Sequence, residues 1–518
     1  MKKALTIIFA SLFATAMYGQ SNFGKIQGKV TDSKTKAPIA YATILLEKDG
    51  IRKGGAYTDD NGKYVINALD PGDYSITVKY LDYSDKKVTG VVVTSNSTKY
   101  MNIEMSQAGA DGTTQIGPVT IRAGKPMIEK DKNSKTLSGA DLAKLPTRGL
   151  GAIASTTSGV SQTNGGGISF LGSRTDGTAY YVDGVRVTGS ASVPQSAQGQ
   201  IDIIQSGIPA QYGDFTGGAV SITTKGPSRF VSRSFELISS SPFDPYHYNQ
   251  AEFSAVGPLW VKNKGGGDKE YVALGYQMAA NLNYSADNSP GFGGFYTVKE
   301  DVLAEIENSP IIANPNSSGF VYRSLLLTKD DLELNKARKN VARYFGNVQG
   351  KLEFLPSKKS SITLFGSFNQ SNGNNWGYAQ NLMNNKEYSN STSQTLRTYV
   401  KFTQRLGDNS NDKDKEKSLF SDAFYNVRLD YQSNWGETQN NNHGTDYFDY
   451  GYVGKFTSYR NPVYSFRNDA QYFIDQNNDT VSRQGYYSLA GFRNNEITFE
   501  ASDKNELRSR YTQSVFNY

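Results

Sequence analysis

The chain has 518 residues, and its 37% hydrophobic and 20% charged residues, with a mean hydropathy of −0.54, exclude a bundle of membrane-spanning helices. The 12% aromatic residues exclude a disordered chain, and the 51 glycines are typical of β-rich chains with many turns. The 55 Lys and Arg residues exceed the 49 Asp and Glu residues by 6, too small an excess for a nucleic-acid partner.

Cysteine does not occur in the sequence, and His247 and His443 are its 2 histidines. This excludes disulfides, thiolate metal sites and cysteine nucleophiles, and it leaves little for histidine-based metal sites or catalytic triads. We therefore expect no enzyme, no catalytic residue, no metal and no cofactor.

Residues 1–19 have the pattern of a secretory signal peptide. Lys2 and Lys3 precede an apolar run over residues 4–16, in which Ala14 and Ala16 form an A-x-A site. Cleavage after Ala16 or after Gly19 fits this pattern, and the alternative is a buried N-terminal helix. The run is too short to span a bilayer as a helix. The mature chain is then exported, either as a soluble protein or as a membrane β-barrel.

Residues 22–106 alternate short strand patterns with turns. The expected strands are residues 25–31, 42–47, 54–58, 64–69, 72–80, 87–93 and 99–105. About seven short strands in a segment of this length predict a small β-sandwich. Residues 58–64 contain Asp59, Asp60, Asn61 and Gly62, which suit either part of a calcium loop or a type I′ hairpin turn at Asn61-Gly62. The lack of a later bidentate Glu favours the turn.

This segment resembles the carboxypeptidase regulatory-like β-sandwich. The matching stretches are residues 26–32, 37–42, 58–64 and 71–74, in the expected order. That domain is non-catalytic, so the resemblance implies a module and not a peptidase.

Residues 107–125 are poor in apolar residues and rich in Gly and Thr, as in a flexible linker. Within it, Val119, Thr120 and Ile121 form a short β-branched stretch. It is either a strand that pairs with a partner or the linker's first contact with the next domain.

Residues 126–227 predict a mixed α/β globule. A helix over 138–146 would be capped by Ser138 and stopped by Pro146. Strands are expected at residues 168–171, 178–182, 200–205 and 218–224. The glycine-rich residues 164–167 suggest either a phosphate cradle or a loop, and the loop is favoured because no Walker Lys-Ser/Thr follows.

Three motifs in this region resemble the plug of TonB-dependent receptors. Residues 179–185 contain Tyr180, Asp183 and Gly184 of a YxxDG core. Residues 201–214, with Tyr212 and Gly213, resemble the end of the plug, and residues 217–225, with Gly217 and Gly218, resemble the strand that leads into the barrel. One departure concerns Leu171-Gly172, where many family members have Arg-Gly; Arg174 follows two residues on. The plug–barrel ion pairs usually assigned to that arginine are therefore in doubt.

Residues 228–518 alternate apolar and polar positions over long segments. The clearest case is residues 424–431, where Asn426, Arg428 and Asp430 alternate with Val427 and Leu429. Transmembrane barrel strands alternate in this way, but so do the strands of a soluble sandwich, and periodicity does not say which face is outside. Aromatic residues at strand ends, as in interfacial girdles, favour the barrel: Tyr246, Tyr248, Trp260, Tyr447 and Tyr450.

Loops of unequal length also fit a barrel. A tight turn is expected near residues 354–359, and long polar stretches at residues 281–342, 369–392, 406–417 and 465–494. The charged run 408–417 suits a ligand patch or, more simply, a solvated loop.

The number of strands predicts a partial barrel. Ten candidates follow Phe230: residues 230–240, 250–258, 268–284, 343–355, 358–371, 394–406, 419–433, 447–460, 494–500 and 507–518. About eight strands enclose only side chains, so ten cannot surround a plug domain. The resemblance implies about twice this number. We therefore expect residues 228–518 to be the N-terminal part of a barrel. One feature points the other way, because the chain ends in Phe516-Asn517-Tyr518 and an aromatic last residue is the signal that barrel assembly usually recognises.

The expected fold is mainly β: an N-terminal β-sandwich, a small α/β plug and part of a transmembrane antiparallel β-barrel. The resemblance implies an outer-membrane importer, with plug and sandwich on the periplasmic side. Its implied partners are outer-membrane lipid, a solute that the sequence does not identify and the TonB energy-coupling protein, which would bind a TonB box at Val119, Thr120 and Ile121. Some sandwich-bearing family members also pair with a surface lipoprotein. The alternative is a non-transporting surface or structural protein.

Overall fold

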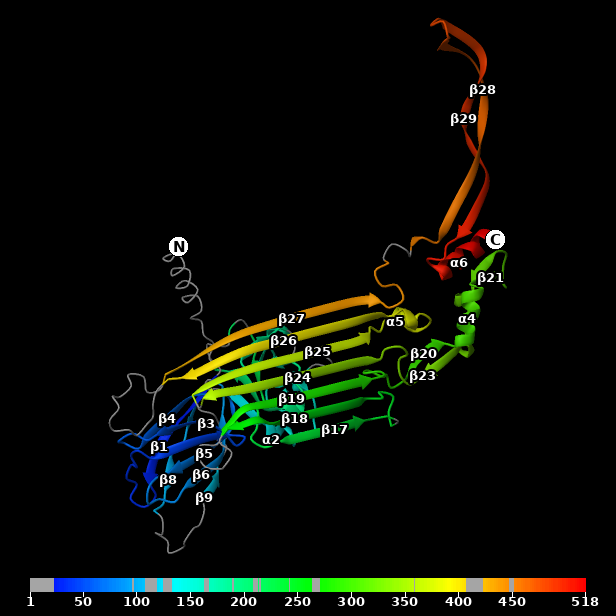
Figure 1. Ribbon diagram of the computed structural model, residues 1–518. Coiled ribbons are helices and arrows are strands. Elements are labelled where there is room, and N and C mark those ends of the chain that lie inside the picture. The colour runs from blue at the N-terminus through cyan, green and yellow to red at the C-terminus, as the bar shows by residue number, and fades with distance from the viewer. Residues whose placement is uncertain are drawn as a thin grey trace. The chain divides into compact units, whose positions relative to one another are not determined.

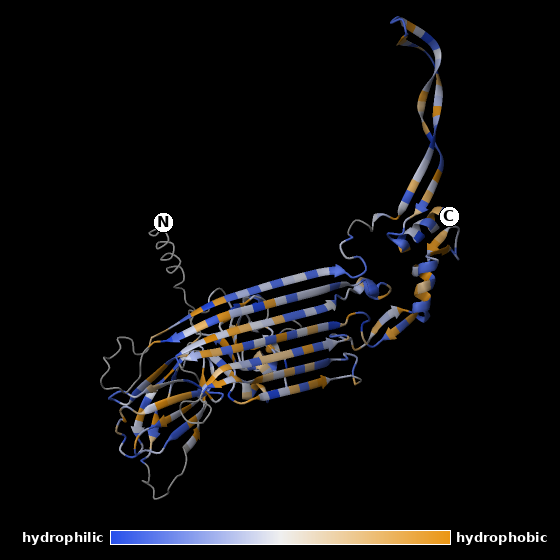
Figure 2. Ribbon diagram, in the orientation of Figure 1, coloured by the Kyte–Doolittle hydropathy of each residue, from blue (hydrophilic) through white to orange (hydrophobic). Residues whose placement is uncertain are grey.

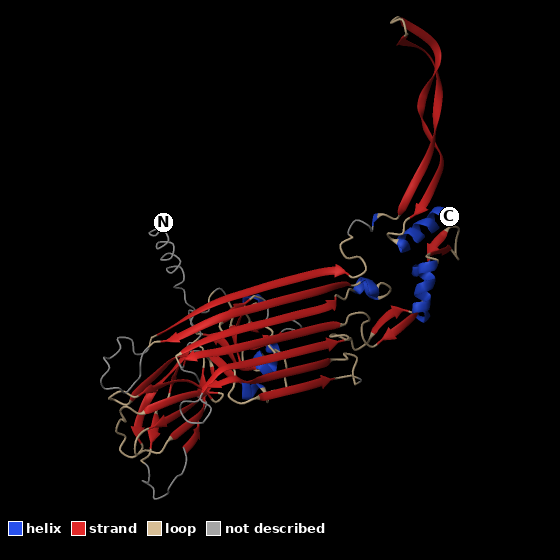
Figure 3. Cartoon of the chain, in the orientation of Figure 1, coloured by secondary structure: helices blue, strands red, loops and turns tan. Residues whose placement is uncertain are grey.

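The computed structural model describes residues 23–95, 97–107, 119–123, 133–162, 167–188, 191–207, 213, 216–241, 243–262, 271–357, 359–406, 423–446 and 451–518. These form two compact units, which are described separately. Unit 1 comprises Met1–Ser285, Arg343–Asn372 and Thr392–Gly436, and unit 2 comprises Ala286–Ala342, Gly373–Ser391 and Glu437–Tyr518. Strands dominate both units (Figures 1 and 3). The signal-peptide prediction and the glycine-rich residues 164–166 lie outside the described residues.

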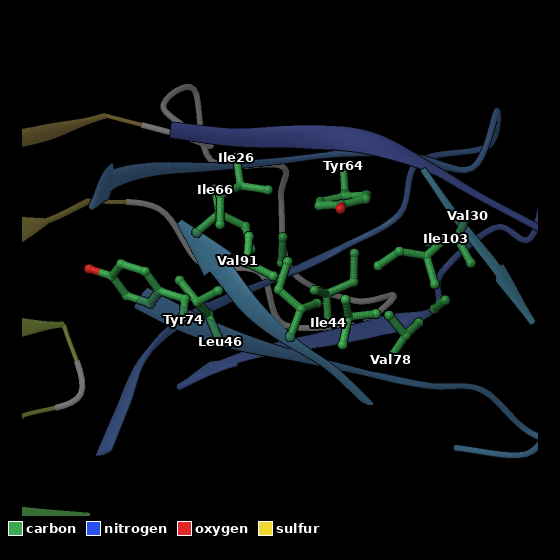
Figure 4. Close-up of a cluster of buried hydrophobic side chains, with 14 of the residues drawn as sticks. Ile26, Val30, Ile44, Leu46, Tyr64, Ile66, Tyr74, Val78, Val91 and Ile103 are labelled. Atoms are coloured by element: carbon green, nitrogen blue, oxygen red, sulfur yellow. The ribbon is translucent and has the colours of Figure 1, made fainter. Parts of the chain in front are cut away.

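The N-terminal sandwich consists of two sheets. One contains β4, β1, β7 and β8, and the other has the order β3-β2-β5-β6-β9. Its strands are β1 (Gly24–Asp32), β2 (Thr43–Lys48), β3 (Ile51–Tyr57), β4 (Lys63–Leu69), β5 (Gly72–Lys79), β6 (Lys86–Val93), β7 (Thr98–Tyr100), β8 (Ile103–Met105) and β9 (Val119–Arg122). Apolar side chains from both sheets meet in one core, among them Ile26, Ile44 and Val78, each with no exposed surface (Figure 4). The alternating burial of β5 is the period-two pattern that its sequence predicts.

The single strand predicted over residues 99–105 is wrong. Two short strands occur instead: β7 pairs in parallel with residues 25–27 of β1, and β8 with residues 30–32. Between them the chain passes over Gly28, where an added Cβ would lie 1.6 Å from the Met101 carbonyl oxygen. This close backbone crossing interrupts the ladder, which apolar alternation alone does not reveal.

The predicted type I′ hairpin at Asn61-Gly62 is also wrong. Gly62 has a φ of 72°, but Asn61 does not have a positive φ. The flanking strands β3 and β4 belong to different sheets, so this turn carries the chain across the sandwich. The Asp59 carboxylate holds it by accepting hydrogen bonds from the backbone N–H groups of Asn61 at 2.9 Å and Lys63 at 2.7 Å.

The plug domain is built on a five-stranded sheet of order β10-β15-β16-β13-β14, the plug sheet. Its strands are β10 (Asn133–Ser138), β13 (Ala179–Val182), β14 (Val185–Val187), β15 (Gln198–Ser206) and β16 (Ala219–Thr224). β11 (Val160–Gln162) and β12 (Ile168–Phe170) form a separate hairpin. All six residues of the central strand β16 are buried. β10, β11 and β14 lie outside the strands predicted from the sequence.

The predicted helix over 138–146 forms, but it is shorter. α2 (Gly139–Leu142) begins at Ser138, whose side chain and Asp141 form a reciprocal capping box. It ends three residues before Leu145, well ahead of Pro146. A second helix, α3 (Leu150–Ala154), buries Ile153 and Ala154 against the plug core.

The wall sheet, as we name it, has seven strands in the order β17-β18-β19-β24-β25-β26-β27 (Figure 1). They are β17 (Ser232–Ser239), β18 (Asn249–Lys262), β19 (Tyr271–Ser285), β24 (Arg343–Ser357), β25 (Ser360–Asn374), β26 (Ser389–Arg405) and β27 (Phe424–Asn440). The pairs β17–β18, β18–β19 and β19–β24 are antiparallel. Each strand corresponds to one predicted between residues 230 and 433.

The two faces of the wall sheet have opposite chemistry, visible as alternating bands along its strands (Figure 2). The buried face is polar: Gln277, Asn347, Gln349, Lys351 and Thr403 are all less than 9% exposed. The exposed face is apolar and includes Leu282, Val348, Leu352, Leu364, Val400 and Leu429. A soluble sandwich has the reverse arrangement. The structure therefore decides in favour of a barrel wall, with its polar side turned toward the plug.

Unit 2 shows that the predicted long loop over 281–342 contains regular structure. Its elements are β20 (Phe295–Val298), α4 (Glu300–Asn308), β21 (Ile311–Ala313), β22 (Phe320–Tyr322), η3 (Arg323–Leu326), η4 (Lys329–Asp331) and β23 (Leu332–Asn335). α5 (Tyr378–Asn381) and η5 (Asn385–Glu387) lie in the segment after β25. Asp287 is fully buried and pairs with Arg338 at 2.5 Å, and the Arg338 guanidinium lies over the Trp376 ring. No helix in the described part of the chain is long and apolar enough to cross a membrane.

Two predictions at the end of the chain are wrong. Residues 465–494 are not a loop, because β28 (Gly454–Ile474) and β29 (Thr480–Ala501) form an antiparallel hairpin there, in which only residues 475–479 form the turn. Residues 507–518 are not a strand but form α6 (Glu506–Asn517), capped by the Asn505 side chain. In α6 the residues Leu507, Tyr511 and Val515 recur every four positions, which suits a helix.

Candidate functional site

The site begins at a tight turn in the plug. Asp183 and Gly184 join β13 to β14, and Val182 pairs with Val185 across the turn. Their φ values are 50° and 80°. A two-residue hairpin with positive φ at both positions favours Asp-Gly, because glycine pays no steric cost there and aspartate tolerates this conformation. The backbone of the motif therefore explains why these two residue types occur together.

The Asp183 carboxylate first binds within the plug sheet. Its Oδ1 accepts a hydrogen bond from the Thr224 backbone N–H at 2.8 Å, and its Oδ2 accepts one from the Thr224 hydroxyl at 2.7 Å. The Asp183 N–H donates to the Ile222 carbonyl at 2.8 Å. The turn is thus fixed against the C-terminal end of β16, the strand that precedes the wall sheet in the chain.

The same carboxylate then binds the wall sheet. Lys351 of β24 lies 2.9 Å from Oδ2, and the Tyr399 hydroxyl of β26 donates to Oδ2 at 2.9 Å. Arg428 of β27 donates to the Asp183 backbone carbonyl at 2.8 Å. Lys351 also donates to the Thr224 hydroxyl. We call Asp183, Thr224, Lys351, Tyr399 and Arg428 the Asp183 latch.

Burial makes the latch strongly interdependent. The side chains of Asp183 and Lys351 are only 8% and 9% exposed. Burial alone would raise the pKa of Asp183, but the Lys351 charge and the hydrogen bonds from Lys351 and Thr224 outweigh it, and the pKa lies below its ordinary value. Asp183 is therefore a buried carboxylate held charged by its partners. Removing one partner would leave an uncompensated charge inside the protein.

The plug also contacts the wall sheet through residues that do not belong to the latch. Arg148 of the plug pairs with Glu236 of β17 at 2.5 Å, although both side chains are about 40% exposed. The backbone N–H of Ser196 donates to Glu252 at 2.6 Å. Asn347 donates to the Ser192 carbonyl at 3.2 Å. The plug is thus bound to the wall by several independent polar contacts.

The departure at Leu171-Gly172 forms an exposed turn in which both residues have positive φ. Arg174 is exposed as well. In this chain the plug–wall ion pairs in the described residues instead use Arg148 and Asp183. Sequence reasoning named Asp183 only as a motif position. Its wall partners Lys351 and Tyr399 were missed, because contacts between residues more than 160 positions apart leave no local signal.

The remaining plug motif residues have structural positions. A Cβ on Gly218 would lie 2.4 Å from the Phe170 ring, and one on Gly217 would lie 2.8 Å from the Ser173 hydroxyl. Tyr180 is half-buried against the plug core, and burial raises its pKa. The Gly213 carbonyl accepts a hydrogen bond from Arg186 at 3.4 Å, and an added Cβ there would meet nothing within 4 Å. Tyr212 lies outside the described residues.

Charged side chains connect the sandwich with strands β24 and β26 of the wall sheet. Lys53 pairs with Glu353 of β24 at 2.6 Å, with both side chains largely buried, and Lys401 of β26 pairs with Asp70 at 2.8 Å. Arg405 donates to the Ala68 carbonyl at 2.9 Å. A cavity of about 50 Å³ lies among these groups and the latch, with Lys53, Asp70, Asp183, Lys351, Glu353 and Lys401 in its lining.

A larger cavity of about 330 Å³ lies between the β13–β14 hairpin and strands β25 to β27. Arg186 of the plug and Arg397, Asp430 and Gln432 of the wall are among its polar lining residues. Among the described residues, no group of three or more His, Cys, Asp or Glu side chains could hold a metal ion.

Val119, Thr120 and Ile121 lie in β9, which pairs in parallel with β6 of the sandwich. This segment is therefore the edge strand of a sandwich sheet, and it does not belong to the Asp183 latch. It is a strand, as its β-branched residues favour.

The family model described as "Carboxypeptidase regulatory-like domain" matches residues 25–106. The TonB-dependent transporter Oar of Myxococcus xanthus is 24% identical over 231 residues, which are 42% of this chain and 22% of the relative. This chain therefore spans about a fifth of the length of that curated relative.

Solved structures of receptors are also similar to the chain. The siderophore receptor PirA of Acinetobacter baumannii has 16% identity and a TM-score of 0.36, covering 60% of this chain and 45% of its own. The alcaligin outer-membrane receptor FauA of Bordetella pertussis has 11% identity and a TM-score of 0.36, covering 60% of this chain and 40% of its own.

By their names, these proteins are a transporter and two receptors. The resemblance to a TonB-dependent receptor with an N-terminal regulatory-like domain is confirmed by the family match and the curated relative.

Proposed function

We propose that this protein is a receptor that imports a solute across the outer membrane through a plugged β-barrel, with energy supplied by TonB. The observation that carries the proposal is the Asp183 latch: the plug is bound to the polar face of the wall sheet, while the apolar face is exposed. When the plug moves, the polar groups of both surfaces can exchange their contacts with each other for hydrogen bonds to water, so a polar interface is compatible with displacement of the plug as a unit.

The roles of individual residues belong to this proposal. Val119, Thr120 and Ile121 are the segment that TonB binds, by adding a strand to its sheet. Asp183 and Gly184 hold the plug in the closed state. Gly217 and Gly218 allow the close packing that places β16 at the centre of the plug sheet. We propose no chemical class for the solute, because the lining of neither cavity selects one class.

The alternative is a surface or structural protein that does not transport. Such an anchor needs the exposed apolar face of the wall sheet but not a separate domain inside it. In the described part of the chain, the plug has a five-stranded sheet of its own, and a buried ion pair joins it to the wall sheet. This favours transport.

Uptake by a deletion strain tests the proposal. Cells carrying the wild-type full-length gene are compared with cells carrying Thr120→Pro or Ile121→Pro for growth on, and uptake of, a panel of candidate solutes. Proline removes a backbone N–H and should block strand addition. We expect lost uptake with unchanged surface binding of the solute.

Thr98→Ala, in the short strand β7 of the sandwich, is the matched control that should leave uptake intact. Unchanged uptake in both proline variants would contradict the assignment of the TonB-binding segment. Recovery of the wild-type protein in the soluble periplasm would contradict the proposal as a whole.

A further inference from the structure

The sandwich and the plug bind neighbouring positions of β24. Lys351 binds the Asp183 carboxylate of the plug, and Glu353, two positions further on, pairs with Lys53 of the sandwich at 2.6 Å. Residues two positions apart on a strand point to the same face and lie about 7 Å apart. The side chains of Lys53 and Glu353 are only 14% and 12% exposed, so this ion pair is nearly as buried as the one in the latch.

Strand β26 repeats this arrangement. Its Tyr399 hydroxyl donates to the Asp183 carboxylate, and Lys401, two positions further on, pairs with Asp70 of the sandwich at 2.8 Å. The Lys401 side chain is largely buried, whereas that of Asp70 is about half-exposed. On both strands, the residue that binds the sandwich is therefore the next one on the buried face after the residue that binds the plug.

The sandwich also contacts the segment that joins the plug to the wall sheet. The Arg229 backbone N–H donates to the Asp49 carbonyl at 3.1 Å, and the Ser228 hydroxyl donates to the same oxygen at 3.3 Å. Asp49 lies in the turn between β2 and β3. The sandwich is thus held both by the wall sheet and by the chain just before it.

One small cavity is lined by all three parts. Its volume of about 50 Å³ is enough for only a few water molecules. The plug contributes Asp183 and Thr224 to its lining, the sandwich contributes Lys53 and Asp70, and the wall contributes the partners of these residues. The sandwich therefore closes one side of the space around the Asp183 latch.

We propose that the sandwich is a lid that shields the Asp183 latch from water, so that undocking of the sandwich loosens the plug. The inference rests on the proposed function, since it concerns the release of the plug. With the sandwich docked, Asp183 and Lys351 attract each other in surroundings of low polarity, where the attraction between opposite charges is strong. Water admitted from the sandwich side would screen this attraction.

Undocking would also create a competitor for Lys351. Glu353 would lose its sandwich partner and become a buried carboxylate without a counterion, which is strongly unfavourable. It lies about 7 Å from Lys351 along the same face of β24, so it would attract the ammonium group away from Asp183. In the docked state Lys53 neutralises Glu353 and prevents this competition.

Hydrogen exchange of single backbone amides tests the inference in the purified full-length chain, without TonB or a solute. Two amides report on two separate events. The Arg229 N–H, which is bonded to Asp49, reports whether the sandwich is docked. The Thr224 N–H, which is bonded to the Asp183 carboxylate, reports whether the latch is closed. Each amide exchanges faster when its local structure opens more often.

The Lys53–Glu353 pair can be broken from either side. Lys53→Met removes the sandwich charge, and Glu353→Gln removes the wall charge while leaving the sandwich sequence unchanged. We expect each variant to raise the exchange rates of the Arg229 and Thr224 amides at least about tenfold, because one buried charge is left without its partner. The double variant Lys53→Met/Glu353→Gln leaves neither charge, so both rates should return toward those of the wild type.

Lys36→Met is the matched control. It removes a sandwich lysine whose ion pair with Glu104 is exposed and does not involve the wall sheet, so neither amide should respond. Faster exchange at Arg229 with unchanged exchange at Thr224 would show that the sandwich undocks without loosening the latch, and would overturn the inference. The absence of a response at both amides in both single variants would show that this ion pair does not hold the lid, and would also overturn it.

Failure of the proposed function has a different signature. In that case the two amides would respond as expected, because exchange is measured without TonB, but Thr120→Pro and Ile121→Pro would leave solute uptake unchanged.

Discussion

The Asp183 carboxylate and the Lys351 ammonium lie 2.9 Å apart, with both side chains more than 90% buried, and they join the central turn of the plug to the wall sheet. Two more wall strands contribute, because Tyr399 binds the same carboxylate oxygen and Arg428 binds the Asp183 carbonyl. One turn of the plug is thus held by β24, β26 and β27 together. The combined strength of these contacts determines how firmly the plug is held against the wall sheet.

Removing one charge of this pair should open the plug. Asp183→Asn leaves the Lys351 charge buried without a counterion, which costs about 3–5 kcal/mol. We expect faster proteolysis of the plug in membrane-inserted protein. Arg148→Ala at the half-exposed pair with Glu236 is the control, with an expected cost below about 1 kcal/mol. The double variant Asp183→Asn/Lys351→Met should recover part of the protection, and equal sensitivity of all three variants would contradict the role of the latch.

The same carboxylate predicts a pH dependence. Since the pKa of Asp183 in the folded protein lies below its ordinary value of 3.8, its charge stabilises plug docking above that value. This contribution is lost as the pH falls through the lowered pKa. Protease protection of the wild-type plug should hold at neutral pH and decline only below about pH 4. In Asp183→Asn this acid-induced decline should be much smaller, and an identical pH profile in both proteins would refute the assignment.

Glycine at position 218 should be required for plug packing. A Cβ there would overlap the Phe170 ring, so Gly218→Ala should destabilise the plug by roughly 1–3 kcal/mol. The matched control is Gly226→Ala, where nothing lies within 4 Å of the added Cβ, and its effect should stay within about 0.5 kcal/mol. Urea unfolding followed by tryptic digestion compares the two. A larger effect at Gly226 than at Gly218 would count against the packing argument.

The exposed apolar face of the wall sheet should tolerate no charge. Val348 is 53% exposed on that face, between the buried Asn347 and Gln349. Val348→Arg should lower the yield of membrane-inserted protein, by a free energy of roughly 2–4 kcal/mol if the residue lies near the bilayer midplane. Leu325→Arg, in a 70% exposed position of unit 2, should insert normally. Normal insertion of Val348→Arg would argue that this face does not meet lipid.

Much of the architecture could be predicted from the sequence. The strands of the wall sheet alternate with a period of two, as in residues 424–431, and that signal is local. Ser138 before an apolar run indicated the start of α2 for the same reason. Where local signals compete, prediction failed: α6 contains aromatic residues that fit a strand as well as a helix, and a side-chain cap at Asn505 together with packing of Phe516 on Phe456 decided for the helix.

Only the tertiary structure decided which face of each strand is buried and which groups meet. Periodicity separates Gln349 from Val348, but it is symmetric with respect to inside and outside, and the plug's polar contacts turn the polar face inward. The sequence by itself determined that Asp183 and Gly184 make a turn with positive φ, because that preference belongs to the residues. It could not determine that Lys351, Tyr399 and Arg428 close on this turn, since contacts across more than 160 residues depend on how the sheets pack and not on local spacing.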